Sequence, residues 1–141
     1  MAIVVGPTCW QQLLRDPLAF TELGDAYEGG YLICRSGGTL WIVAPGSTEV
    51  SRNWFARDDA VTTANANAAC GDWFVPTFAQ LLNPGYTCRT YWDEYSNCWY
   101  WSSTERDIPG FAWVVNFTNG SNGGGNKPNA YCVRAFRCVT Y

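Results

Sequence analysis

The sequence predicts an α+β domain, because it combines strand-like alternation with two helix signals. Two segments, 98–105 and 111–117, place large apolar residues at every second position, which is the spacing of β-strands. Between them, residues 105–110 hold charges, a proline and a glycine, which favour a turn. Helix signals occur at 58–70 and 77–82. We therefore expect a central hairpin around which the rest of the chain is organised.

Length and composition narrow the class of protein. A chain of 141 residues suits one domain that buries its own core. Charged residues make up only 15% of the chain and tryptophan occurs 8 times, a profile typical of β-rich domains on extracellular or virion surfaces. The formal net charge of −3 and the lack of a basic run argue against a nucleic-acid partner. No apolar run could cross a bilayer and no leader is recognisable, so we expect assembly in a host cytoplasm without membrane insertion.

Residues 1–23 are predicted to form an attachment segment that precedes a domain at 24–141. Thr8 and Gln11 have the spacing of a capping box, which indicates a short helix. The segment carries more large apolar side chains than a surface helix leaves in water, so we expect them to pack on a partner subunit or on the domain. These side chains are Trp10, Leu13, Leu14, Leu18 and Phe20.

The domain itself begins with a second hairpin and continues with the two helices. Strands are expected at 31–35 and 40–44, joined by a glycine-containing turn. The alanine-rich stretch 58–70 can form a helix with a small-residue face. The next helix is better marked, since Thr77 and Gln80 again have the spacing of a capping box.

The chain is predicted to close with one strand at 131–139. Arg134 and Arg137 have opposite parity within it, so they should face different sides of the sheet. We expect one of them to pair with Glu105 and the other to be exposed.

A recognition surface is predicted where the loops 84–98 and 118–130 flank the central hairpin. An antiparallel pair brings both flanks to the same end of the sheet, and loops on a rigid sheet are common binding sites. Aromatic rings there offer stacking area, while side-chain oxygens and one lysine offer polar contacts to a glycan or a neighbouring protein. The alternative is that the aromatics simply cover the hairpin. The residues expected to bind are Tyr91, Trp92, Asp93, Tyr95, Asn122 and Lys127, whereas Trp101 is expected in the core.

The sequence gives little support to catalysis. The chain has no histidine, so a serine or cysteine nucleophile lacks its commonest base. Asp93 and Glu94 are neighbours that would point in opposite directions on a strand, and a solvated acidic turn explains them better than an acid/base pair. No Cys-x-x-Cys pair occurs either, which argues against a zinc site. We predict a protein that is not an enzyme and that needs no cofactor or metal.

Several segments follow one another in the order of a known family: 24–31, 71–81, 100–105, Ala112-Trp113, Asn119-Gly120, Lys127 and 131–137. Through them the chain resembles the Lcl C-terminal domain family, which has a C-type-lectin-like fold and is related to the formylglycine-generating group. The resemblance covers about residues 24–139 and implies a twisted, mostly antiparallel sheet with two flanking helices and long loops. The calcium-ligand motifs of sugar-binding C-type lectins are missing, and the enzyme's cysteine pair cannot be mapped.

The 7 cysteines are expected to be structural rather than catalytic. The resemblance implies a disulfide between the first helix and the last strand, where Cys70 and Cys138 lie in comparable places. Cys88 and Cys98 could close the loop 84–98, which we call the aromatic loop. A reducing cytoplasm would instead leave all thiols free. Cys132 and Cys138 would lie about 20 Å apart in one strand, too far to bond each other.

These observations predict a phage virion protein, either a tail-tip or fibre-tip module or a capsid-surface decoration. Its expected partners are other virion proteins, further copies of itself, and a host surface glycan or protein. A secreted or surface bacterial adhesin is the alternative, and the neighbouring genes would separate the two. A third interpretation is a receptor-binding protein diversified by a retroelement, prompted by the asparagines near the C-terminus, although turn chemistry also explains these.

Overall fold

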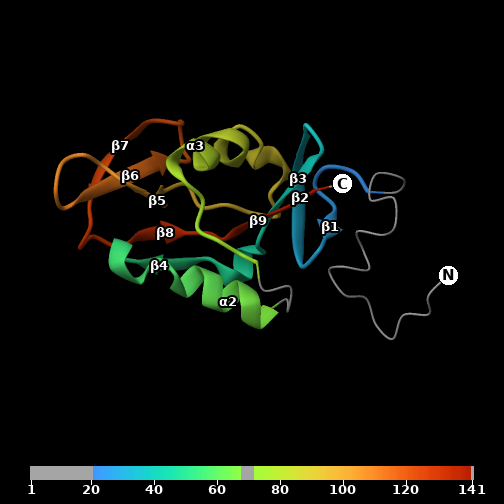
Figure 1. The fold of residues 1–141 in the computed structure, drawn as a ribbon, viewed down its shortest axis with the longest axis horizontal. Helices are drawn as coiled ribbons and strands as arrows, with labels where there is room; N and C mark the ends of the chain where they lie inside the picture. The colour runs from blue at the N-terminus through green and yellow to red at the C-terminus, as the bar shows by residue number, and fades with distance from the viewer. Residues whose placement is uncertain (1–20, 68–71, 141) are drawn as a thin grey trace.

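The computed structural model describes residues 21–67 and 72–140 (Figure 1). Within these residues the strands form two sheets rather than one, and the predicted α+β class is confirmed. The smaller sheet has the order β1-β2-β3-β9, with strands Ala26–Tyr27, Gly30–Ser36, Thr39–Val43 and Phe136–Thr140. The larger sheet has the order β4-β8-β5-β6-β7, with strands Val50–Arg52, Tyr131–Val133, Trp99–Glu105, Phe111–Asn116 and Asn122–Asn126. Residues 1–20 of the predicted attachment segment, with all of the apolar side chains named for it above, lie outside the described residues.

Both predicted hairpins are confirmed. In the smaller sheet β2 and β3 pair from Tyr31↔Val43 to Ser36↔Thr39, and two glycines with positive φ close the turn between them. In the larger sheet β5 and β6 pair antiparallel, with Trp99 opposite Asn116.

The predicted loop 118–130 contains a strand, β7, which corrects the expectation of an irregular segment. β7 pairs with β6 along its whole length, and its centre consists of three glycines. A Cβ on Gly125 would lie 2.9 Å from the rings of both Trp101 and Tyr131. Gly125 therefore lets the backbone lie directly on two large aromatic rings, which explains how a segment with little apolar surface of its own joins the sheet.

The predicted last strand is in fact two strands, β8 and β9, which belong to different sheets. The chain leaves the larger sheet after Val133 and enters the smaller sheet at Phe136. β8 pairs antiparallel with β4 and parallel with β5, whereas β9 pairs antiparallel with β3. No glycine or proline marks the crossing, so the sequence carries no turn signal there. This crossing joins the two sheets into one body.

The two helices cover the larger sheet from different sides (Figure 1). α2, Asp59–Asn67, buries Ala60 and Ala64 and contacts β4, so the predicted helix is confirmed where the chain is described. α3, Phe78–Gln80, begins at the predicted capping box, in which the Thr77 and Gln80 side chains each bond the other's backbone N–H. Short helical turns complete the chain as η1 Gly46–Thr48, η2 Trp54–Ala56, η3 Leu81–Tyr86 and η4 Arg89–Tyr91.

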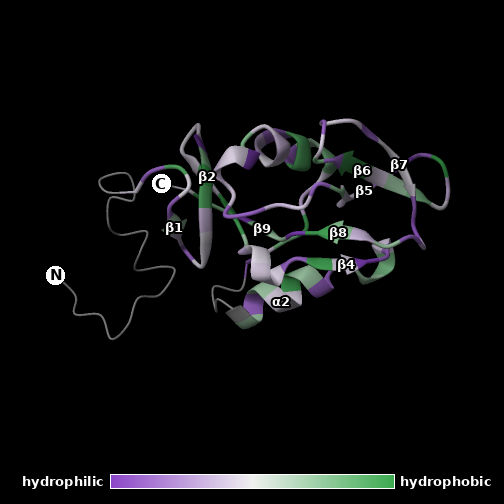
Figure 2. Cartoon of the chain, turned by 180° about the vertical axis from the view of Figure 1, so that it is seen from behind, coloured by the Kyte–Doolittle hydropathy of each residue, from purple (hydrophilic) through white to green (hydrophobic). Residues whose placement is uncertain are grey.

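The apolar core has three parts. The first lies against the smaller sheet and α2. The second lies between the sheets under the aromatic loop, and the third lies beneath the larger sheet. Figure 2 shows the hydrophobic character of β6 and β8, which line this interior. Trp101 is buried in the third part, as predicted. In the part of the chain that the structure describes, no helix has the length and apolar character needed to span a membrane.

Candidate functional site

The predicted recognition loop is anchored from within by the buried guanidinium of Arg134. Its Nε and Nη2 lie 3.1 and 3.0 Å from Glu49 Oε1. Nη1 donates to the Ala44 carbonyl at 2.9 Å and lies 3.3 Å from Asp93 Oδ1, while Nη2 donates to the Glu94 carbonyl at 2.7 Å. One side chain thus binds the turn after β3 and the aromatic loop to the crossing between β8 and β9. Charge-assisted bonds of this kind are among the strongest in proteins.

Glu49 extends this network to the start of β5. Its carboxylate accepts hydrogen bonds from the Tyr100 hydroxyl and, at 2.6 Å, from the Ser96 hydroxyl. The Ser96 N–H donates to the Tyr100 oxygen at 2.8 Å. Burial, followed by the bond to Glu49 and its negative charge, raises the pKa of Tyr100, so this phenol stays protonated and acts as a donor. Sequence reasoning missed Glu49, because nothing in its neighbourhood marks it as the partner of distant groups.

Two of the predicted recognition residues are structural. Trp92 is only 5% exposed and packs against Phe117, Phe136 and Tyr100, with ring centroids 5.0, 5.6 and 5.9 Å away. The Arg134 guanidinium lies over its ring at 4.9 Å. This corrects the prediction that Trp92 offers a stacking surface: for this residue the alternative, that the aromatics cover the hairpin, is the right one.

Asp93 is likewise engaged internally. Besides its contact with Arg134, its Oδ2 accepts a hydrogen bond from the Gly46 N–H at 2.8 Å. Both carboxylate oxygens therefore serve to fix the loop, and the hydrogen bonds that we expected Asp93 to offer a partner are made within the domain.

Tyr91 and Tyr95 remain on the surface, as predicted. They are 38% and 37% exposed and flank the buried Trp92 in sequence. Tyr95 also contacts the core, with its ring centroid 6.4 Å from that of Trp92. A tyrosine with one face packed and the other in solvent can stack on a ligand at little entropic cost.

The predicted polar residues of the second loop are separated from each other. Asn122 is exposed at the start of β7, opposite Val115. Lys127 lies beyond the other end of β7, where its backbone N–H bonds Gly110 and its ammonium lies 3.5 Å from Glu105. Because β5 spans about 20 Å from end to end, Lys127 is remote from Tyr91 and Tyr95. The expectation that one surface unites the two loops is therefore wrong for this residue.

Arg137 forms a second buried ion-pair cluster. Its Nη1 donates to the Glu28 carboxylate and carbonyl, both at 3.0 Å, and its Nε pairs with Asp72. Burial raises the pKa of Glu28 above its usual value, although the Arg137 hydrogen bond and charge oppose that rise. Both arginines are thus buried, which corrects the expectation that one is exposed and the other pairs with Glu105. Because the chain passes from one sheet to the other between Val133 and Phe136, the alternation of side chains along a single strand does not apply to Arg134 and Arg137.

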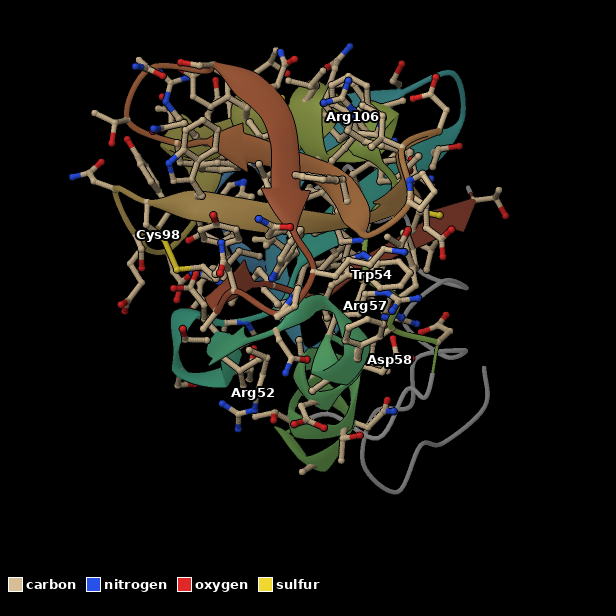
Figure 3. The ribbon with its side chains drawn as sticks, turned by 90° about the vertical axis from the view of Figure 1, so that its left-hand side faces the viewer. Arg52, Trp54, Arg57, Asp58, Cys98 and Arg106 are labelled. Carbon is tan, nitrogen blue, oxygen red and sulfur yellow. A yellow bond between two sulfur atoms is a disulfide. The ribbon has the colours of Figure 1, made fainter. Side chains whose placement is uncertain are left out.

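The far end of the larger sheet carries a cation–aromatic cluster that the sequence did not indicate. The guanidinium of Arg57 and the ammonium of Lys127 lie over the Trp54 ring at 3.6 and 4.4 Å. Next to them Phe55 is 67% exposed. Figure 3 shows Trp54, Arg57 and Asp58 close together. Of this cluster, Phe55 offers the largest apolar area to a partner.

The disulfide pattern differs from both expected pairings. Cys98 is bonded to Cys132, which links the start of β5 to β8 (Figure 3 labels Cys98). Cys88 carries a free thiol, so the expected Cys88–Cys98 bond is absent; Cys138 is also a free thiol, and its expected partner Cys70 lies outside the described residues. The adjacent strands β5 and β8 pair at Tyr100↔Cys132, so Cys98, two residues before Tyr100, lies diagonally across from Cys132, with 7.0 Å between their Cα atoms. Sequence spacing could not show this because the two strands are remote along the chain.

Among the residues that the structure describes, no three His, Cys, Asp or Glu side chains are arranged to hold a metal ion. Comparison with known proteins gives no assignment: no protein-family model and no curated protein matches this chain.

Proposed function

We propose that this chain is a non-enzymatic bacteriophage virion protein that displays a C-type-lectin-like domain for adhesion. The proposal starts from the resemblance to the Lcl C-terminal domain family, carried by blocks such as 100–105 and 131–137. The observation that supports it best is the role of those blocks in the fold. Tyr100, Trp101 and Arg134 are internal residues that hold strands and loops together. The blocks therefore act as a scaffold, which leaves recognition to exposed residues outside them.

The recognition surface in this proposal is the loop 91–97, with Tyr91 and Tyr95 as its contact residues. The bonds of Asp93 and Ser96 to the buried network hold the loop, so binding would not have to order it first. Its exposed groups are the two phenols, the Glu94 carboxylate and the Asn97 amide, which suit a glycan or a protein surface better than a phosphate-rich partner.

Two measurements test the proposal. Purified particles should contain this chain, and antibodies against it should label the tail or the capsid in electron micrographs. Adhesion is tested with a Tyr91→Ala/Tyr95→Ala double variant, whose thermal stability should change little while its binding to host cells falls at least tenfold. Phe55→Ala removes an aromatic ring that is more exposed than either tyrosine and lies at the far end of the larger sheet, and it should leave binding unchanged. A binding loss in Phe55→Ala alone would move the recognition surface to the cation–aromatic cluster.

A secreted or surface bacterial adhesin is the second candidate. The Cys98–Cys132 disulfide favours it, since such bonds persist mainly in oxidising surroundings. Detection of the chain on bacterial cells or in the medium, together with its absence from particles, would establish this second function.

A further inference from the structure

Two of the free thiols, those of Cys34 and Cys88, lie near each other inside the fold. Cys34 belongs to β2 of the smaller sheet, and Cys88 lies between η3 and η4 at the base of the aromatic loop. Both side chains are half-buried and pack against the same part of the core. Burial, and with it the nearby Cys88, raises the pKa of Cys34, so the two thiols lie within electrostatic range of each other. They are remote in sequence, yet β2 contacts both η3 and η4, between which Cys88 lies.

A β-bulge in β2 directs Cys34 toward its partner. Leu32 pairs with Ile42 and Cys34 with Trp41, so Ile33 is the additional residue on this strand. Without the bulge, Cys34 would face the same side as Leu32, which packs in the first part of the core. With the bulge, both Ile33 and Cys34 face the second part of the core, where Cys88 lies.

The backbone of Cys88 is also held in place. Its N–H bonds the Pro84 carbonyl at 2.9 Å, and its carbonyl accepts the Tyr91 N–H at 3.0 Å. The remaining free thiol in the described chain, that of Cys138, lies on β9 and is exposed. It therefore provides a natural control for oxidation that depends on exposure alone.

We propose that Cys34 and Cys88 are an oxidisable dithiol that closes to a disulfide on exposure to a low-molecular-weight disulfide such as oxidised glutathione. Burial and the neighbouring Cys88 raise the pKa of Cys34, so Cys34 is the poorer initiator. The Cys88 thiolate attacks one glutathione sulfur, forms a mixed disulfide and expels the first glutathione thiolate. The Cys34 thiolate then attacks Cys88 Sγ and expels the second. Two electrons pass from the protein to one oxidised glutathione, and the two protein protons end on the two glutathione thiols.

The closed bond would tie β2 of the smaller sheet to the segment that carries Tyr91. A cross-link removes conformational freedom from the unfolded chain, so oxidation should raise the midpoint of thermal unfolding. It would thereby make the aromatic loop more resistant to opening after the protein leaves a reducing cytoplasm.

The experiment incubates the native full-length chain with oxidised glutathione, alkylates the remaining thiols and maps the digested protein by mass spectrometry. Trypsin should release 16–35 joined to 58–89, and dithiothreitol should separate them. Because 58–89 also contains Cys70, loss of the joined species in Cys88→Ser is required to assign the bond. Cys34→Ser should accumulate glutathione on Cys88, and Cys138→Ser should form the joined species as the wild type does.

Three results would overturn the proposal. The first is a wild-type chain that retains glutathione on Cys88 without closing the bond. The second is a joined species that persists in Cys88→Ser, and the third is an oxidised wild type that unfolds at the same temperature as the reduced form.

Discussion

Replacing Trp92 by alanine should destabilise the domain by about 3–5 kcal/mol, the usual cost of deleting a buried aromatic ring. The side chain is only 5% exposed, and it fills the space between Phe117, Phe136 and Tyr100. Its ring also supports the Arg134 guanidinium from one face. Deletion of the Trp92 ring would leave a cavity and would also remove a packing contact of the buried Arg134 guanidinium.

The size of this effect can be compared with the stability of the whole domain. At roughly 0.05–0.15 kcal/mol per residue, a chain of this length is stable by about 7–20 kcal/mol. A loss of about 3–5 kcal/mol would therefore remain measurable in a folded protein. It corresponds to a fall in the unfolding temperature of roughly 10–15 °C.

The assay is guanidinium denaturation followed by circular dichroism, with the disulfide kept intact. Tyr91→Ala is the matched control, since this neighbouring ring is 38% exposed and should cost less than about 1 kcal/mol. Equal, small losses of stability in the two variants would refute the reasoning, because they would show that the Trp92 ring is not part of the core.

Three further predictions concern the stability of the domain. Arg134→Ala should cost about 3–5 kcal/mol by urea denaturation, because it leaves Glu49 without its buried counter-charge; a loss under about 1 kcal/mol would contradict the ion-pair role. Stability should fall as the pH rises above about 10, because Tyr100 ionises in the unfolded chain but keeps its proton in the fold. Tyr100→Phe should reduce that alkaline slope, and an unchanged slope would count against it. Gly30→Ala should lower the unfolding temperature by several degrees, since its Cβ would lie 2.2 Å from the Val43 carbonyl, whereas a Cβ on Gly123 meets nothing within 4 Å and its substitution should be tolerated.

The sequence alone was sufficient for elements whose signals are local. The hairpin at β2 and β3 needs only alternation and a pair of glycines that accept positive φ. The start of α3 needs only Thr77 and Gln80, three residues apart. Burial of Trp101 followed from its place in the central hairpin. In each case the deciding groups are near neighbours along the chain.

The tertiary structure alone decided which members of similar-looking groups are internal. Tyr91 and Trp92 are adjacent aromatics with the same local signals, yet only the second points into the core. The partners of Arg134 lie 85 and 41 residues away, at Glu49 and Asp93. No spacing rule connects positions that far apart, because their proximity depends on how the whole chain is folded.

The crossing from β8 to β9 shows the same limit for strands and cysteines. Residues 131–139 read as one strand, because alternation describes each half equally well and no turn residue interrupts it. Only the pairing of β8 with β5 and of β9 with β3 separates the two halves, and the first of these pairings brings Cys132 beside Cys98. Sequence patterns thus determined the elements with local signals, whereas β7, sheet membership, buried ion pairs and the sulfur pairing depended on contacts between distant segments, which form only when the core closes.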